Sequence, residues 1–290
     1  MRLVTRSDGS VAMLEADQVV PLVPGEGATG WSMLEVIELA GREGLDAVAA
    51  LAGRSRAKLE DEQLLAPIPL PGSVIAAPVN YVDHMHEMSE QRDIRSLGLF
   101  LKARSSVTGP GSTVLLPYTD RRFDQEGELG VVIGRVAENV TAEQALKHVF
   151  GYTCLLDITM RGGEDRSTRK SFRSFTPIGT WLTTADEVGD PGNLLLTCSV
   201  SGVERQSAKT SDLIWSVPEL ISYASTVMTL YPGDIIASGT PQGVGPIAGG
   251  DTIEVRIESV GELAVRVSDA GAIACPTLGA NSGPVPPPAR

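Results

Sequence analysis

The chain has 290 residues, of which 42% are hydrophobic, enough to bury a large core in one large domain or two modest ones. Its net charge of −12 argues against a general affinity for nucleic acid or anionic membranes, so an anionic substrate would need a local basic pocket. No apolar stretch reaches the roughly 20 residues that span a bilayer, and the N-terminus does not resemble a signal peptide. The three cysteines form no CxxC pair. We therefore expect a cytoplasmic protein with reduced thiols.

The first part of the chain, residues 1–70, is expected to form a small N-terminal α+β domain. Short alternating segments predict strands over about 1–30. Ser32 and Glu35 have the spacing of a capping box, which predicts a helix over about 33–52. The domain boundary is placed at a proline-rich linker that contains Pro67, Pro69 and Pro71.

The second and larger part, residues 71–275, reads as short β-type segments separated by turns that contain glycine or proline. Thr141 predicts the start of a helix over 142–150, and Ser216 with Glu219 three residues later predicts the start of another helix. Residues 276–290 are rich in proline and have no apolar period, which predicts a disordered tail.

Two carboxylates, Glu126 and Glu128, stand at the head of an apolar run that continues to Ile133. In a strand, side chains two residues apart share a face, roughly 7 Å apart along the chain. Two like charges beside a core strand repel each other and lose hydration, so they need a cation. Oxygen ligands suit Mg²⁺, Mn²⁺ or Ca²⁺. The alternative is an edge strand whose carboxylates face solvent, and the pair alone does not decide between the two readings.

Asp157 interrupts the apolar segment from Tyr152 to Thr159, which reads as a buried strand. A buried aspartate is unusual unless it is paired or binds a metal. It would supply a third oxygen ligand beside Glu126 and Glu128. The alternative is an aspartate that caps a turn or pairs with Arg161.

His84 and Glu87 follow the apolar residues 74–77 and would share one face of a helix, where they can form a hydrogen bond. A carboxylate-oriented imidazole is a usual general base for activating water. A zinc pair formed by His84 and His86 is an alternative, although the chain offers few further zinc ligands. A purely structural pair of histidines is a third reading.

The cationic candidates are Lys102, Lys170 and Arg161, which follows Asp157 by four residues. Lys102 and Lys170 border apolar or aromatic neighbours, so their ammonium groups are expected to project into a cleft. Taken singly, each of the three reads better as a surface charge. The glycine-rich loop at 237–245 lacks the fingerprints of nucleotide-binding loops. Its amides and the Thr240 hydroxyl fit a carboxylate better.

The order of these motifs resembles the fumarylacetoacetate hydrolase family over about residues 70–270. The matching motifs are Asn80-Tyr81-x-x-His84-x-x-Glu87, Leu99-Phe-Leu-Lys102, Glu126-x-Glu128, Gly151-Tyr152, Leu156-Asp157-Ile158-Thr159-x-Arg161, Lys170-Ser-Phe-x-x-Phe-Thr-Pro-x-Gly179, Pro232-Gly-Asp-x-Ile and Gly239-Thr-Pro-x-Gly-Val-Gly245.

The resemblance implies an α+β, mainly β fold, a mixed β-sandwich roll around one divalent ion, usually Mg²⁺ or Mn²⁺, with Ca²⁺ an alternative in crystals. It also implies a homodimer that acts on a small-molecule 2-oxo or diketo acid. Glu126, Glu128 and Asp157 would be the metal ligands, and His84, Glu87 and Lys170 the catalytic groups. Substrate contacts would come from Tyr81, Lys102, Arg161, Glu164 and Thr240.

The activity implied by the resemblance is metal-dependent hydrolysis of a C–C bond in an acylpyruvate or related diketo acid, such as a fumarylpyruvate- or fumarylacetoacetate-like compound, through an enolate. The alternatives are an isomerase or decarboxylase of 2-hydroxy-dienedioates or oxaloacetate in aromatic catabolism, and a non-catalytic protein that binds 2-oxo acids.

The chain departs from the usual family pattern at Glu164, Arg173, Thr180 and Ser238. Arg173 would bind a second carboxylate or pair with Glu164 or Asp165, and the ion pair is the favoured reading. The residues expected to bind the metal and to form the His84–Glu87 dyad match the family pattern. The four departures therefore affect the expected identity of the substrate and not the expected chemistry at the metal.

Overall fold

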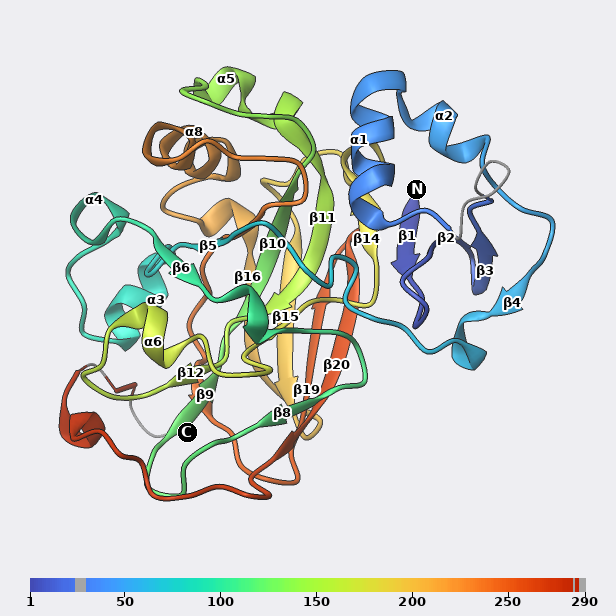
Figure 1. Ribbon diagram of the computed structural model, residues 1–290. Helices are drawn as coiled ribbons and strands as arrows, with labels where there is room; N and C mark the ends of the chain where they lie inside the picture. The colour runs from blue at the N-terminus through green and yellow to red at the C-terminus, as the bar shows by residue number, and fades with distance from the viewer. Residues whose placement is uncertain (24–29, 284, 287–290) are drawn as a thin grey trace.

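The computed structural model describes residues 1–23, 30–283 and 285–286. Within these ranges the largest element is a mixed ten-stranded sheet that runs from the N-terminal strands to the centre of the molecule (Figure 1). Its strands, in spatial order, are β4 (Ala57–Lys58), β3 (Gln18–Pro21), β2 (Val11–Glu15), β1 (Arg2–Thr5), β14 (Leu182–Thr184), β11 (Val149–Leu156), β10 (Gly127–Ile133), β17 (Ile235–Ala237), β5 (Val74–Ala76) and β6 (Phe100–Lys102).

The N-terminal strands extend the central sheet, because β1 pairs with β14 in antiparallel register. The predicted capping box is confirmed: the Ser32 hydroxyl accepts from Glu35 N–H, and Glu35 reaches back to Ser32. The helix is shorter than predicted, since α1 (Met33–Glu43) ends at Gly44 and a separate α2 (Leu45–Ala49) follows. Residues 24–29 of the predicted strand region lie outside the described residues.

A second sheet packs against the central one, and the main hydrophobic core lies between the two sheets. Its order is β16 (Val203–Lys209), β15 (Leu195–Val200), β19 (Thr252–Ile257), β20 (Gly261–Ser268) and β8 (Thr113–Leu115). Strand β10 alternates between two cores: Leu129, Val131 and Ile133 pack with residues of the second sheet, whereas Val132 packs with the N-terminal elements. The predicted mainly β sandwich is confirmed at this level.

Two smaller sheets and several short helices surround this sandwich. The small sheets are β12 (Thr159–Met160), β9 (Phe123–Gln125) and β18 (Gly245–Pro246), and β13 (Thr176–Pro177) with β7 (Val107–Thr108). The remaining helices are α3 (Val82–Glu87), α4 (Ile94–Leu97), α5 (Ala142–Ala145), α6 (Arg166–Arg169), α7 (Ala185–Val188) and α8 (Val217–Val227). Helices α3, α4 and α6 gather on the left of Figure 1.

The helix predicted from Ser216 is confirmed as α8, with a capping box to Glu219. The helix predicted over 142–150 is wrong beyond His148, because α5 passes through a 3₁₀ turn and β11 begins at Val149. Val149 and Phe150 are needed in the sheet, where Val149 pairs with Ile133. Tertiary pairing therefore overrides the local helical pattern.

The described part of the C-terminal tail lies against the body: Thr277 contacts Arg121, and the Pro286 carbonyl accepts from Arg122. Residues 284 and 287–290 of the predicted disordered tail lie outside the described residues. The described part of the chain holds no helix with the length and apolar character needed to cross a bilayer.

Candidate active site

Strands β10 and β11 bring the three predicted carboxylates together. Glu126 precedes β10, Glu128 lies within it, and Asp157 directly follows β11, with its N–H donating to the Glu126 carbonyl at 2.8 Å. One carboxylate oxygen from each residue lies within 4.8 Å of the others, and all three side chains are buried. The alternative of a solvated edge strand is wrong, because β10 pairs with both β11 and β17.

The two glutamates differ in their electrostatic environment. Burial alone would raise the pKa of Glu126, but Lys170 at 2.6 Å and Arg161 at 2.7 Å hold the pKa below its usual range. Burial, together with the neighbouring charge of Asp157, raises the pKa of Glu128 well above its usual value. Glu128 is thus the carboxylate that lacks a counter-charge.

The donor set fits a hard divalent cation. Glu128 is 1% exposed, and across the described ranges no Lys, Arg or His lies within ion-pair distance of it. In the described part of the chain, its carboxylate accepts one hydrogen bond, from Gly239 N–H at 2.8 Å. An isolated buried carboxylate is costly, and three carboxylate oxygens are ligands that Mg²⁺ and Mn²⁺ accept. Glu126, Glu128 and Asp157 would hold such an ion.

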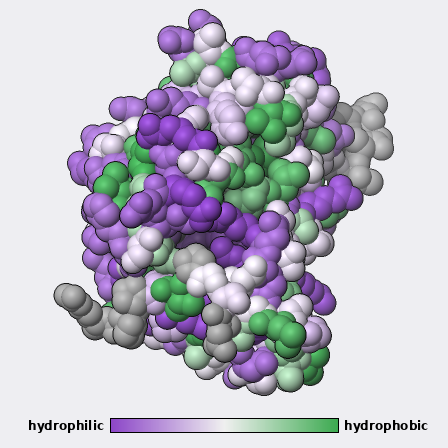
Figure 2. All heavy atoms as spheres, turned by 90° about the vertical axis from the view of Figure 1, so that its left-hand side faces the viewer, coloured by the Kyte–Doolittle hydropathy of each residue, from purple (hydrophilic) through white to green (hydrophobic). Residues whose placement is uncertain are grey.

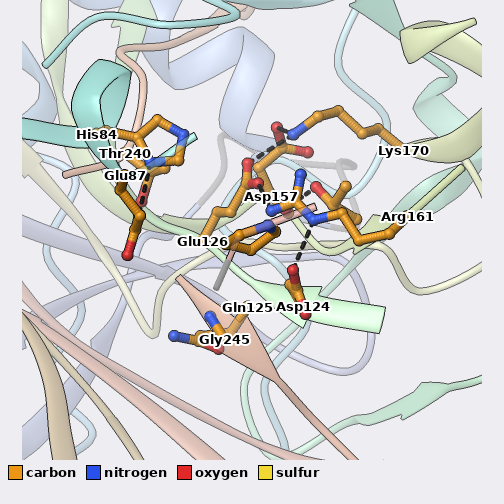
Figure 3. Close-up of polar contacts among 12 residues, drawn as sticks. His84, Glu87, Asp124, Gln125, Glu126, Asp157, Arg161, Lys170, Thr240 and Gly245 are labelled. Carbon is orange, nitrogen blue, oxygen red and sulfur yellow. Dashed lines mark hydrogen bonds and ion pairs between the residues drawn. The ribbon is translucent and has the colours of Figure 1, made fainter. Parts of the chain in front are cut away.

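Lys170 lies inside this acidic group, which the sequence did not predict. Its ammonium donates to Glu126 at 2.6 Å and to Asp157 at 2.5 Å (Figure 3). A bound cation would therefore share these two carboxylates with Lys170. The Lys170 side chain is 4% exposed, so the alternative of a surface charge is wrong for it.

Lys102 does not project into a cleft, contrary to expectation. Its fully buried ammonium donates to the Asp157 carboxylate and to the backbone carbonyls of Lys170 and Phe175. Burial lowers the pKa of Lys102, and the charge of Asp157 opposes this shift. Because its ammonium already donates to these three protein acceptors, Lys102 holds the Asp157 carboxylate in place. The described contacts give no support to direct substrate binding by Lys102.

Arg161 pairs with two carboxylates, and neither of them is Asp157. Its Nε donates to Asp124 at 2.6 Å and its Nη2 donates to Glu126 at 2.7 Å. Asp124 was not predicted as a site residue; it is fully buried and also accepts from Arg122. Its spacing was a signal, because Asp124, Glu126 and Glu128 are each two residues apart, although β9 and β10 belong to different sheets and Glu126 lies between them.

The predicted dyad forms on α3. His84 Nδ1 lies 2.9 Å from Glu87 Oε2, and Gly243 N–H donates to Glu87 Oε1 at 2.9 Å. Figure 3 shows this pair on the side of the acidic group opposite Lys170 and Arg161. His86 is exposed, and among the described residues the one group with metal-ligand spacing is the carboxylate triad, so a zinc pair at His84 and His86 gains no support.

In the glycine-rich loop, Gly239 N–H donates to Glu128 and Gly243 N–H donates to Glu87, so these amides bind carboxylates of the chain itself. The Thr240 hydroxyl donates to the Gly127 carbonyl at 2.9 Å and accepts from Gln206 Nε2 at 2.8 Å. Gln206, on β16, also accepts from Gly127 N–H at 2.9 Å and was missed by sequence reasoning, because nothing local marks it. The described contacts of Thr240 hold the loop against β10.

Glu164, Arg173 and Tyr81, which were also considered as substrate contacts, form no described hydrogen bond with the carboxylate triad. Glu164 pairs with Arg121 at 3.0 Å and accepts from the Thr277 hydroxyl. Arg173 is exposed, and among the described residues it forms no ion pair with Glu164 or Asp165, so the favoured pairing is wrong. Tyr81 is buried, and its hydroxyl has no hydrogen-bond partner among the described residues. Burial, followed by the charge of Glu128, raises the pKa of Tyr81.

A cleft joins four of the predicted site residues: His84, Glu126, Arg161 and Lys170. Pro78, Val79, Met88 and Glu90 also line it, together with two arginines that the sequence analysis did not single out, Arg166 and Arg169. Burial and the neighbouring charge of Arg161 lower the pKa of Arg169 to about 10. Figure 2 shows a hollow lined by hydrophilic residues on the face that carries α3 and α6.

Comparison with known proteins gives the family. The family model for the fumarylacetoacetate (FAA) hydrolase C-terminal domain matches residues 73–268. Maleylpyruvate hydrolase from Aquipseudomonas alcaligenes is 46% identical over 223 residues, which cover 73% of this chain and 78% of that protein.

Solved structures of related proteins superimpose on nearly the whole of this chain. Maleylpyruvate hydrolase from Sphingobium sp. SYK-6, in complex with manganese(II) and pyruvate, has a TM-score of 0.80 and 36% identity and covers 95% of this chain and 100% of its own. A 2-hydroxyhepta-2,4-diene-1,7-dioate isomerase from Mycobacterium marinum has a TM-score of 0.74 and 31% identity, with coverages of 93% and 99%. The predicted fold and the prediction of a metal-dependent enzyme are confirmed, and the chain belongs to the fumarylacetoacetate hydrolase family.

Proposed function

We propose that this protein is a divalent-metal-dependent hydrolase that cleaves a C–C bond in acylpyruvate-type diketo acids. The observation that carries the proposal is the His84–Glu87 dyad, which faces the same cleft as Glu126 of the carboxylate triad. A relative named as a hydrolase of this substrate class, and another that binds manganese and pyruvate, support it.

The dyad is suited to activate water. In the neutral tautomer with hydrogen on Nδ1, His84 donates a hydrogen bond from Nδ1 to Glu87 Oε2, and its Nε2 keeps a free lone pair. Because Gly243 N–H holds the other oxygen of Glu87, the carboxylate is fixed and the imidazole is oriented. His84 Nε2 can then take a proton from water while the hydroxide adds to the distal carbonyl of the substrate.

When the hydrated carbonyl collapses, the electron pair of the broken C–C bond passes to the pyruvate fragment as an enolate. The enolate takes up the proton that His84 removed from water, and the acyl fragment leaves as a carboxylic acid that ionises to the carboxylate. A divalent cation held by Glu126, Glu128 and Asp157 would supply Lewis acidity that stabilises negative charge on the 2-oxo acid. Lys170, which lines the cleft and contacts Glu126 and Asp157, adds positive charge at the same place.

An isomerase or decarboxylase remains the second candidate, because a structural relative is named as a dienedioate isomerase. Such reactions use the same enolate but need no attack by water. Substitution of His84 would then leave turnover largely unchanged. A 2-oxo acid binding protein is the non-enzymatic alternative, and the homodimer, the cytoplasmic location and Mg²⁺ as the physiological ion stay predictions.

The test compares His84→Gln with His86→Gln, since both histidines lie on α3 but only His84 is buried at the cleft. Pyruvate release from acylpyruvates is measured with Mn²⁺ and with Mg²⁺. We expect His84→Gln to lower kcat by about 10²- to 10⁴-fold and His86→Gln to retain it. Equal hydrolysis by wild type and His84→Gln would overturn the proposal. Isomerisation or decarboxylation that survives His84→Gln would support the second candidate, and a metal-dependent thermal shift with pyruvate but no turnover would support the binding protein.

A further inference from the structure

The described C-terminal segment, residues 275–283 and 285–286, lies beside the two short strands β9 and β12 (Figure 1). Strand β9 contains Asp124, and Arg161 directly follows β12. The two strands pair in antiparallel register, so the start of β9 and the end of β12 lie together. The segment follows the residues that match the family model, which end at 268, and the mechanism proposed above gives it no role.

The C-terminal segment joins the start of β9 to the end of β12. Nη2 of Arg121, before β9, donates to the Thr277 carbonyl at 2.6 Å and to the Thr277 hydroxyl at 2.8 Å. The same nitrogen donates to Glu164, after β12, at 3.0 Å. The Gly163 N–H donates to the Gly279 carbonyl, also at 3.0 Å. The segment therefore holds together the end of the strand pair at which Arg161 lies.

A continuous series of hydrogen bonds leads from this segment to Glu126, one of the proposed metal ligands. Arg122 Nη1 donates to the Pro286 carbonyl at 3.0 Å, and Arg122 Nε donates to Asp124 Oδ1 at 2.7 Å. Asp124 Oδ2 accepts from Arg161 Nε at 2.6 Å. Nη2 of Arg161 then donates to Glu126 Oε1 at 2.7 Å. The Arg161 N–H also donates to the Arg122 carbonyl at 2.8 Å, so backbone and side chains connect the same two residues.

Burial makes each link of this series depend on the next. Asp124 and Arg161 are 0% and 4% exposed, so water cannot replace a partner that either of them loses. Without Arg122, the Asp124 carboxylate would turn fully toward Arg161 and draw the guanidinium away from Glu126. A partner that hydrogen-bonds a metal ligand fixes the orientation of that ligand. The position of Arg122 therefore affects how Glu126 presents its carboxylate.

We propose that the C-terminal segment is a clamp for the metal centre, in which Arg122 and Asp124 are positioning residues that hold Arg161 and thereby orient Glu126 for the cation. The inference rests on the proposed metal ligands and does not depend on the reaction that the enzyme catalyses. Because coupling between two sites is reciprocal, a bound cation should also hold the segment more firmly against β9 and β12.

Calorimetric titration with Mn²⁺ compares Arg122→Met with the matched control Arg95→Met. Each arginine pairs with an aspartate two residues away, Arg122 with Asp124 at 2.7 Å and Arg95 with Asp93 at 2.8 Å, but Arg95 is exposed. We expect Arg122→Met to weaken Mn²⁺ binding about 3- to 10-fold and Asp124→Asn to weaken it about 10- to 100-fold. Arg95→Met should bind like wild type. Wild-type affinity in Arg122→Met would overturn the inference.

The thiol of Cys275 reports whether the segment is in place. Cys154 and Cys198 are buried, whereas Cys275 is partly exposed, so iodoacetamide should alkylate Cys275 in the folded protein. Its Sγ lies 3.2 Å from Thr277 Oγ1, within the segment. We expect Mn²⁺ to slow this alkylation in wild type by about 3- to 10-fold, the reciprocal of its effect on binding, and to have little effect in Arg122→Met. Equal rates for wild type with and without Mn²⁺ would contradict the clamp.

A thermal melt in EDTA separates positioning from stability. A merely structural Arg122 would lower the Tm of Arg122→Met but leave its Mn²⁺ affinity and the effect of Mn²⁺ on Cys275 unchanged, which would overturn the inference. If Asp124→Asn does not fold, Arg122→Met decides, because the Arg122 side chain is 25% exposed. A wild type that binds Mn²⁺ but hydrolyses no acylpyruvate would refute the proposed function and leave both measurements valid. A wild type that binds no Mn²⁺ would refute the clamp.

Discussion

The backbone N–H of Gly239 donates to Glu128 Oε2 at 2.8 Å, and in the described part of the chain this is the one hydrogen bond to that carboxylate. Gly239 has φ +94°, and a Cβ there would lie 2.7 Å from Asn80 Cβ, so the loop can approach this closely only with glycine. Glu128 therefore has a donor but no counter-charge, and its charge requires a cation from outside the chain.

Glu128→Gln should stabilise the metal-free protein and remove its response to metal. Glutamine keeps an oxygen that can accept from Gly239 N–H but carries no charge to desolvate. In EDTA, we expect the free energy of unfolding to rise by about 1–3 kcal/mol. Mn²⁺ should raise the Tm of wild type and have little effect on the variant. Thermal melts with EDTA and Mn²⁺ measure both effects, with the exposed Glu138→Gln as control. A variant that responds to Mn²⁺ like wild type would contradict the metal assignment.

The raised pKa of Glu128 also predicts a pH dependence of stability. In the metal-free folded protein this carboxyl keeps its proton above the usual glutamate pKa of 4.5, at which the unfolded chain releases it. The folded state then binds more protons, so its stability falls as pH rises from about 4.5 through the folded pKa. The opposite slope expected from Glu126, whose pKa is lowered, is common to wild type and Glu128→Gln.

Chemical unfolding of wild type and Glu128→Gln in EDTA across this pH range isolates the effect of Glu128. The stability advantage of the variant should grow with pH, whereas parallel curves would refute the prediction. Because binding of a metal displaces the proton, stabilisation of wild type by Mn²⁺ should also increase with pH.

Lys102→Met should destabilise the fold strongly. The change removes a fully buried ammonium and leaves Asp157 with Lys170 as its remaining cationic partner. Loss of one member of a buried ion pair typically costs about 3–5 kcal/mol. The matched control is Lys58→Met, whose partner Glu60 is exposed and whose loss should cost at most about 1 kcal/mol. Urea unfolding compares the two, and equal losses would show that the buried contact contributes little.

Gly243→Ala should impair the dyad, and Gly250→Ala provides a control for backbone strain. The two glycines have φ +97° and φ +98°, so alanine is equally strained at both. A Cβ at Gly243 would overlap the carbonyl of Arg205, whereas nothing lies within 4 Å of one at Gly250. The loop must therefore shift in Gly243→Ala and withdraw the amide that holds Glu87.

Steady-state kinetics should show a fall in kcat of about 10-fold or more in Gly243→Ala, with near-normal kcat in Gly250→Ala. Both variants should lose a similar increment of stability from the strain they share. Full activity in Gly243→Ala would mean that the Gly243 amide is not needed to orient Glu87.

Local spacing determined much of the candidate site. His84 and Glu87 are three residues apart on one short helix, so their contact follows from helical geometry wherever α3 packs. Glu126, directly before β10, and Glu128, within it, are two residues apart in the chain, so their proximity also has a local cause. The order of these motifs along the chain also identified the family, because each motif is a contiguous stretch that the sequence displays directly.

The ionic partners were decided by the tertiary structure. Glu164 pairs with Arg121, 43 positions away, and not with its neighbour Arg173, while Lys102 reaches Asp157 across 55 positions. Residues 142–150 show the same limit: an apolar pattern that suits a helix becomes the start of β11, because Val149 pairs with Ile133 on β10. Among the described residues, the lack of a counter-charge at Glu128 and at Arg169 is likewise visible only when every neighbour is in place.

The sequence by itself thus predicted most of the groups of the candidate site, since residue type and short-range periodicity are written in the chain. Only the tertiary structure decided which charges neutralise each other and which remain free for a metal or a substrate. The physical reason is that Coulomb interactions and desolvation depend on distances in space and on burial, which packing sets and local sequence does not.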